Sequence, residues 1–184
     1  AEPRAGAGPS GRRVAVLGAG PAGVAAAATL ASLGHAVTLF SAAPEPGGVA
    51  GGTIPAERLP DPIIRTEIDA VLRSSGQVER RYGVRLSKEL TLDQLLAEGF
   101  DAALVALGLA RSVPLPRAHP PASGVTSALE FLEGIKRGNK ITGCVLVLGG
   151  GNTAIDAATS AKRAGAADVS IVYRRSFTEL PAWP

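Results

Sequence analysis

The sequence has 184 residues, a formal net charge of +3 and a hydrophobic fraction of 46%, and aromatic residues make up 4% of it. The basic residues never occur in runs longer than two, which argues against a nucleic-acid-binding surface. No stretch reaches the roughly 18 consecutive apolar residues of a membrane-spanning helix, and a single cysteine forms no internal disulfide, so we expect no membrane contact and a cytoplasmic setting. The chain contains no methionine, even at position 1, which favours a segment of a longer protein.

The first part of the chain has the pattern of a β-α-β unit. Residues 1–12, rich in Gly, Pro and Ala, predict a flexible lead-in. Residues 13–17, apolar without a break from Val14 to Leu17, are typical of a strand buried in a parallel sheet. A helix over 21–33, ended by Gly34, leads to a second strand over 36–40, which completes the unit.

The rest of the chain predicts a second such unit after a long middle region. In that region we expect a loop over 44–48, helices over 63–72 and 91–97, a strand pair or meander over 77–86, a strand over 101–107 and a Pro-rich connection over 111–123. A helix over 127–137 then precedes a strand over 143–148, a helix over 152–164 and a strand over 169–173. The predicted fold class is α/β, with two Rossmann-like dinucleotide-binding units with parallel sheets over 13–122 and 123–184, the second truncated.

A glycine-rich turn joins the first strand to the first helix. It consists of Gly18, Ala19, Gly20, Pro21, Ala22 and Gly23. In such a turn the first glycine makes the bend, the second lets the backbone approach a pyrophosphate, and the third lets helix and strand pack closely. At the end of the second strand, where a carboxylate usually binds a ribose, the chain has Ser41, with Glu45 nearby as a substitute or as a solvated loop acid. The turn therefore predicts a bound dinucleotide whose ribose is held less firmly than usual.

A second turn of the same type follows the strand over 143–148. It consists of Gly149, Gly150, Gly151, Asn152 and Thr153, with Ala154 in the third glycine position. The strand after it ends in Arg174 and Arg175 instead of an acid, and guanidinium groups there suit the 2′-phosphate of NADPH. The alternative is a pair of surface arginines at a strand end. Two dinucleotide turns in one chain indicate an enzyme that moves electrons between two nucleotide cofactors.

The remaining candidate residues suggest no catalytic or metal-binding group. Asp156, one turn into its helix, is explained by the positive helix N-terminus. His35, His119 and Trp183 have no partner at the spacing of a triad or a metal site. Cys144, within a strand, is expected to be a small buried residue.

Several sequence blocks resemble the small, flavin-containing subunit of NADPH-dependent glutamate synthase and the matching flavin and NADPH region of dihydropyrimidine dehydrogenase, both FAD-dependent pyridine nucleotide oxidoreductases. The matching blocks are residues 14–23, Pro46-Gly47-Gly48, Ile54-Pro55 with Arg58-Leu59-Pro60, residues 149–156, residues 172–176 and residues 179–182. The resemblance runs from about residue 13 to the end of the chain.

The resemblance implies the cofactors and their sites. FAD would bind the first turn, lined by residues 19–23, by the loop from Ser41 through Gly47 and Gly48 to Val49, and by Arg58. NADPH would bind the second turn, through Gly150 to Thr153 with Arg174 and Arg175. NADPH would reduce the flavin, and electrons would pass to iron–sulfur clusters and a partner subunit or domain outside this chain.

The chain also departs from this family. Ser41 replaces the family's acid, residues 106–108 read Ala-Leu-Gly where Ala-Thr-Gly is usual, and the cluster-binding cysteines and the returning segment of the flavin site are not within the 184 residues. We therefore expect two incomplete domains. Two alternatives stay open, an NADPH-dependent flavin monooxygenase or oxidase, and a degenerate nucleotide-binding module without turnover.

Overall fold

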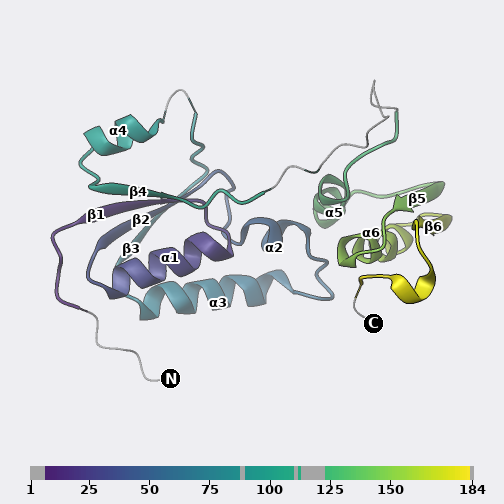
Figure 1. Ribbon diagram of the computed structural model, residues 1–184, viewed down its shortest axis with the longest axis horizontal. Coiled ribbons are helices and arrows are strands. Elements are labelled where there is room, and N and C mark those ends of the chain that lie inside the picture. Colours follow the sequence, from purple (N-terminus) through teal and green to yellow (C-terminus); the bar gives the residue numbers. More distant parts are fainter. Residues whose placement is uncertain (1–6, 88–89, 110–111, 113–122, 183–184) are drawn as a thin grey trace. The chain divides into compact units, whose positions relative to one another are not determined.

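The computed structural model describes residues 7–87, 90–109, 112 and 123–182. The chain forms two compact units, the first from residues 1–51 and 60–108, the second from residues 52–59 and 109–184 (Figure 1). Residues 52–59 thus belong to the second unit although they lie within the first unit in sequence. We describe each unit by itself.

The first unit is built on a four-stranded parallel sheet with the strand order β3-β2-β1-β4. The strands are β1 (Arg13–Leu17), β2 (Ala36–Ser41), β3 (Val78–Tyr82) and β4 (Ala102–Val105). The helices are α1 (Pro21–Ser32), α2 (Gly48–Thr53, which runs into the second unit), α3 (Asp61–Ser74) and α4 (Leu92–Ala97). The α/β class with parallel strands is confirmed.

The two central strands, β1 and β2, are covered on both faces, which explains the apolar run from Val14 to Leu17 in β1. Val16 faces a core that includes Ala27 of α1 and Leu72 of α3. Its neighbour Leu17 faces the opposite core, which includes Leu95 of α4. Because side chains alternate along a strand, a strand covered on both sides carries apolar residues at every position. In Figure 1, α1 and α3 lie together on one side of the sheet and α4 lies on the other.

The region after α3 differs from the expectation of a strand pair or meander. It contains one strand, β3, which pairs in parallel with β2. Gly83, at φ 76°, ends the strand, and the N–H groups of Gly83 and Val84 donate to Ala43 and Ser41 at the end of β2. After β3 the chain therefore hydrogen-bonds to the end of β2 and does not form a hairpin. The other boundaries differ by a few residues, and the expected loop over 44–48 runs directly into α2.

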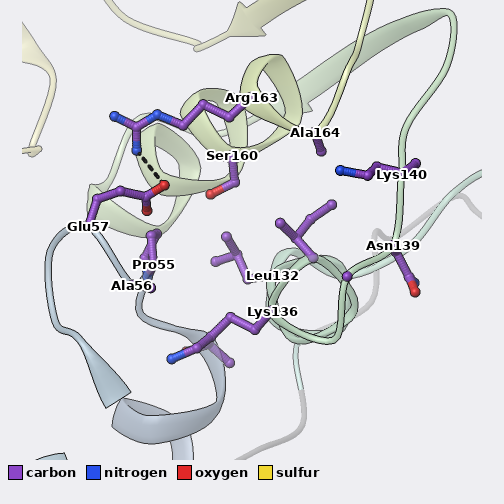
Figure 2. A pocket seen from close by; sticks show the side chains of 13 residues that line it. Pro55, Ala56, Glu57, Leu132, Lys136, Asn139, Lys140, Ser160, Arg163 and Ala164 are labelled. Carbon is purple, nitrogen blue, oxygen red and sulfur yellow. Dashed lines mark ion pairs between the residues drawn. The ribbon is translucent and has the colours of Figure 1, made fainter. Parts of the chain in front are cut away.

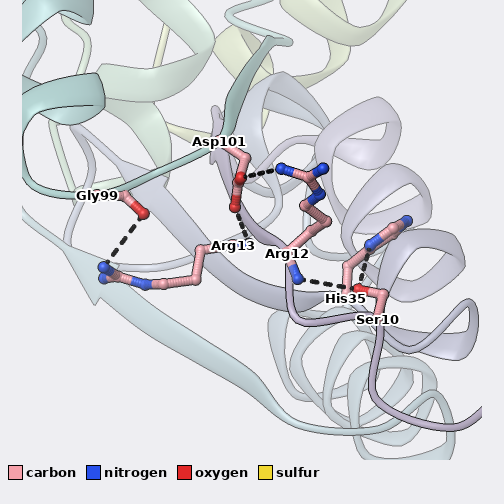
Figure 3. Close-up of polar contacts among 6 residues, drawn as sticks. All are labelled: Ser10, Arg12, Arg13, His35, Gly99 and Asp101. Carbon is pink, nitrogen blue, oxygen red and sulfur yellow. Dashed lines mark hydrogen bonds and ion pairs between the residues drawn. The ribbon is translucent and has the colours of Figure 1, made fainter.

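The amino ends of the strands are joined by a cluster of polar contacts (Figure 3). The Asp101 carboxylate accepts hydrogen bonds from the Arg13 backbone N–H at 2.8 Å and from Arg12 Nη1 at 2.7 Å. These two bonds, the backbone one first, lower the pKa of Asp101 below its ordinary value. Ser10 Oγ lies 2.8 Å from His35 Nδ1, so part of the expected lead-in is bonded to the first unit and His35 has a structural partner.

The second unit pairs β5 (Cys144–Leu148) in parallel with β6 (Asp168–Val172). Its helices are α5 (Ala128–Lys136) and α6 (Asn152–Arg163), followed by a short 3-10 turn, η1 (Phe177–Glu179). Leu132 of α5, Val147 of β5 and Ala157 of α6 meet in its core. Within the described ranges, no helix is long and apolar enough to cross a membrane.

The expectation of a buried Cys144 is wrong. Its side chain is exposed, on the same face of β5 as the exposed Leu146 and Leu148. The alternate residues Val145 and Val147 face the helices. Alternation along a strand covered on one side only therefore places the thiol on the open face.

Candidate nucleotide-binding sites

The first turn is packed so closely that two of its glycines have no room for a side chain. A Cβ added to Gly18 would lie 2.2 Å from the carbonyl oxygen of Ala106, and one added to Gly23 would lie 1.7 Å from the carbonyl oxygen of Gly18. Gly18 also has φ 115°, which L side chains rarely adopt. Ala106, just after β4, is thus part of the turn's packing, a role that the motif itself does not indicate.

The Pro-Gly-Gly loop lies directly on the first turn. The N–H of Gly47 donates to the carbonyl of Ala19 at 2.7 Å, and a Cβ on Gly48 would lie 2.8 Å from the Cα of Gly20. The structure therefore brings together two groups of residues that the sequence assigned to one cofactor. Val49 follows as an exposed residue of α2.

Ser41 lies at the end of β2 but does not present an exposed hydroxyl group to solvent. The residue is buried, and its Oγ accepts the N–H of Ala43 at 3.2 Å. Glu45 is 60% exposed and lies 3.8 Å from Arg65 Nη1. A pair this long and this exposed contributes little to stability, so Glu45 retains the freedom to bind a ribose.

The helix that follows the first turn begins without a side-chain cap. The N-cap of α1 is Gly20, Pro21 follows it, and no side chain accepts the first N–H groups. In contrast, α4 and α5 begin with capping boxes, Thr91 with Gln94 and Ser127 with Glu130. Uncapped N–H groups at a helix N-terminus attract an anion such as a pyrophosphate.

The second turn has the same backbone plan with looser packing. Gly149 has φ 138°, and its N–H donates to the carbonyl of Val172 at 3.0 Å, which ties the turn to the end of β6. Gly151 is the N-cap of α6, again without a side-chain cap, and a Cβ there would meet nothing within 4 Å. Asn152 and Thr153 open α6, and Ala154 is buried in the third position. The space above Gly151 suits the close approach of a phosphate.

The chain after β6 covers the middle of the second turn. A Cβ on Gly150 would lie 2.5 Å from Leu180 Cδ2 and 2.8 Å from Tyr173 Cδ2. The N–H of Ala182 donates to the Gly150 carbonyl at 3.2 Å, and the Tyr173 hydroxyl donates to the Glu179 carbonyl at 3.4 Å. The block at 179–182 carries part of the resemblance, but nothing in its sequence indicated that it contacts the turn.

Glu179 also closes η1 upon itself. Its carboxylate accepts from the Ser176 hydroxyl at 2.7 Å and from the Ser176 N–H at 3.2 Å. These bonds, the hydroxyl one first, lower the pKa of Glu179. The segment over the second turn therefore has a defined local structure.

Arg174 and Arg175 follow β6 at the end where the second turn lies. Both are exposed, and within the described ranges neither makes a hydrogen bond or an ion pair. Guanidinium groups without protein partners are suited to bind an anionic group such as a 2′-phosphate.

Arg58 belongs to the second unit, whereas the other residues assigned to the flavin belong to the first. Its Nη1 donates to both carboxylate oxygens of Asp156, at 2.7 and 2.8 Å. The Asp156 side chain is 12% exposed and that of Arg58 is 56% exposed. Sequence reasoning explained Asp156 by the helix terminus alone and missed this pair, because no local pattern connects residues so far apart in the chain.

Among the residues that the structure describes, no group of three or more His, Cys, Asp or Glu side chains could hold a metal ion. His119 and Trp183 lie outside those residues.

Residues 12–181 match the pyridine nucleotide-disulphide oxidoreductase family, and the chain belongs to it. The chain is 40% identical over 178 residues to the NADP(+)-dependent formate dehydrogenase subunit beta of Moorella thermoacetica, covering 94% of this chain and 25% of that protein. It is 35% identical over 173 residues to the NAD-dependent dihydropyrimidine dehydrogenase subunit PreT of Salmonella typhimurium, covering 92% of this chain and 41% of that protein. The chain thus spans less than half of either relative.

A solved structure of FprA, a Mycobacterium tuberculosis oxidoreductase, has a similar fold, with a TM-score of 0.70 and 19% identity over 93% of this chain and 45% of that one. The family match confirms the resemblance at the level of the family, and with it the class of oxidoreductases and the family's two kinds of cofactor, a flavin and a nicotinamide nucleotide.

Proposed function

We propose that this chain is the FAD- and NADPH-binding part of an electron-input module, which takes a hydride from NADPH and passes electrons to iron–sulfur clusters and a larger partner subunit or domain in the cytoplasm. The observation that carries the proposal is the pair of glycine turns, each followed by a helix whose first N–H groups lack a side-chain cap. One such turn holds one dinucleotide pyrophosphate, so two turns provide for two cofactors.

In this proposal the first turn binds FAD. Residues 18–23 hold the pyrophosphate, and the Gly47–Gly48 loop, bonded to Ala19, covers it. Ser41 sits where a ribose acid is usual, and Glu45 supplies the carboxylate from the adjoining loop. FAD, once bound, accepts a hydride and releases electrons singly, while the protein supplies binding and orientation.

The second turn binds NADPH. Residues 149–153 hold its pyrophosphate, and Arg174 and Arg175, exposed and without partners within the described ranges, bind the 2′-phosphate. The formate dehydrogenase relative carries NADP(+) in its name and the dihydropyrimidine dehydrogenase relative carries NAD. The preference for NADPH or NADH is therefore inferred from the residues of this chain, and not from its relatives.

The experiment is anaerobic titration of the FAD-loaded chain with NADPH and with NADH, followed by flavin absorbance. Retained flavin that bleaches at much lower NADPH than NADH supports both assignments. Replacing Arg174 and Arg175 together by Ser should raise the Kd for NADPH about 10- to 100-fold and change that for NADH less than about threefold. A matched control is Arg137→Ser, since Arg137 is 72% exposed in the same unit and, in the part of the chain that the structure describes, its guanidinium pairs with Glu133 alone, one turn earlier.

Three outcomes would contradict the proposal in different ways. Equal responses to NADPH and NADH would remove the role of Arg174 and Arg175. Oxygen consumption matched to NADPH oxidation in air would favour the oxidase alternative. Failure to retain any flavin would favour a binding module without turnover.

A further inference from the structure

Residues 52–59 are held on α6 by two ion pairs of opposite polarity. Arg58 donates to Asp156, and Glu57 accepts from Arg163 Nη1 at 3.0 Å. Residues 156 and 163 are seven positions apart, so both lie on one face of the helix, two turns from each other. If residues 52–59 crossed α6 in the opposite direction, Glu57 would lie near Asp156 and Arg58 near Arg163, and both contacts would be repulsive. The two ion pairs therefore favour the observed direction.

The helix face under this segment is covered. Ser160, between the two charged positions of α6, is 6% exposed, and Pro55 is also buried. Figure 2 shows Pro55, Ala56 and Glu57 facing α6, with the Glu57–Arg163 ion pair at one side. We call residues 52–59 the strap.

The strap, α5 and α6 line an open pocket of about 270 Å³. The cations at its edge include Lys136 and Arg163, which stand in the last turns of their helices, where positive side chains complement the helix C-terminus. Their placement needs no ligand, so the strap itself is the feature that requires explanation.

Of the four charged residues in these two ion pairs, Asp156 is the most buried and would be the most costly to leave without its partner. A carboxylate that is only 12% exposed is costly to leave unpaired. Arg58 uses Nη1 for this pair, and the other N–H donors of its guanidinium bond to no residue within the described ranges. A guanidinium has five donors in a rigid fork, so fixing one end aims the others.

The strap lies close to the beginning of the second turn's helix. It lies on α6, the helix that the second turn begins, with Arg58 bonded to Asp156 near the start of that helix. We infer that Asp156 is a positioning residue, which holds the strap on α6 and aims Arg58 at the nucleotide bound at the second turn. This inference rests on the proposed function for the part that concerns cofactors, and on the ion pairs alone for the part that concerns the strap.

Hydrogen exchange tests the strap without any turnover. The N–H groups of Arg58 and Leu59 donate to the carbonyl of Pro55 at 2.9 and 3.0 Å, so their exchange reports whether the strap keeps its turn. In the full chain, Asp156→Asn should speed exchange of these amides about 5- to 20-fold and leave β5 and β6 unchanged. Glu133→Gln, which breaks an exposed pair of the same unit, is the matched control and should leave the strap unchanged.

Further variants separate a positioning role from a general loss of stability. The double variant Arg58→Gln with Asp156→Asn should exchange no faster than Asp156→Asn alone, because both changes break one pair. Asp156→Glu, which keeps the charge, should recover part of the protection. Arg163→Gln removes the more exposed pair and should speed exchange only about twofold, and it serves if Asp156→Asn fails to fold.

Flavin reduction provides the second measurement. In Asp156→Asn we expect the rate at saturating NADPH to fall about 10-fold while the Kd for NADPH changes less than threefold, since other residues bind the nucleotide. Unchanged strap exchange in Asp156→Asn, or faster exchange spread over β5 and β6, would overturn the inference. If the wild-type chain does not reduce flavin, the proposed function is overturned instead. Hydrogen exchange alone then tests whether Asp156 holds the strap on α6.

Discussion

The two glycine turns share a sequence pattern, but their glycines are required by different neighbours. In the first turn, Gly18 and Gly23 are each pressed against a backbone carbonyl oxygen, at 2.2 and 1.7 Å from where a Cβ would be. In the second turn the equivalent of Gly23 is Ala154, whose Cβ is accommodated in the core. The close contact of the second turn is instead made by Gly150 with the side chain of Leu180.

This difference shows what each turn can tolerate. A backbone oxygen cannot move without distorting the turn, whereas the end of a leucine side chain can rotate away. The first turn is therefore rigid because of its own packing, and the second is shaped by the segment that follows β6. At the positions expected to approach phosphate there is room for a Cβ, which would lie 3.8 Å from Gly48 Cα at Gly20 and would meet nothing within 4 Å at Gly151.

The largest expected effect comes from exchanging the third position of the two turns. Gly23→Ala should destabilise the first unit by about 3 kcal/mol or more, because the new Cβ must displace the carbonyl of Gly18. Ala154→Gly should cost only about 1 kcal/mol, the difference in helix propensity. Urea unfolding followed by circular dichroism measures both. If the two variants lost similar amounts of unfolding free energy, the two turns would be packed alike, contrary to the difference described above.

A smaller effect is expected where the second turn meets Leu180. Gly150→Ala should cost about 1 to 2 kcal/mol, because Leu180 must leave its position to admit the methyl group. In a Leu180→Ala background the same substitution should cost less than about 0.5 kcal/mol, since the obstructing side chain is gone. Tyr173, which lies 2.8 Å away, accounts for any remaining cost. Additive costs in the double variant would place the origin of the effect in the backbone instead.

The sequence predicted the two turns and their flanking strands because both follow local rules. The glycines, the apolar strand before them and the helix after them lie within a short stretch, so β1, α1, β5 and α6 are found within a residue or two of their predicted places. The strand pairing of β3 was missed because it depends on the return of the chain to Ser41 and Ala43.

The contacts that shape the sites could not be predicted from local pattern. Ala106 at Gly18, Leu180 over Gly150 and Arg58 at Asp156 each join residues from different elements, and their types carry no mark of the partner. An acid one turn into a helix is explained by the helix terminus, so a local argument had no reason to look for Arg58. Long-range pairing of this kind requires the fold.

The smallest expected effect sharpens the comparison through pH. Asp101 in the first unit and Glu179 in the second both have a lowered pKa, but Asp101 binds the backbone of another strand while Glu179 binds Ser176 of its own turn. A lowered pKa means stability that is present above the unfolded value, about 3.9 for Asp, and lost as the pH falls through the folded value. Asp101→Asn should therefore lower the urea midpoint slightly at pH 7 and by less at pH 3. Glu179→Gln should leave the midpoint unchanged at both, because its bonds are local to η1. A midpoint that responds equally to both substitutions would mean that η1 contributes to global stability as β1 and β4 do.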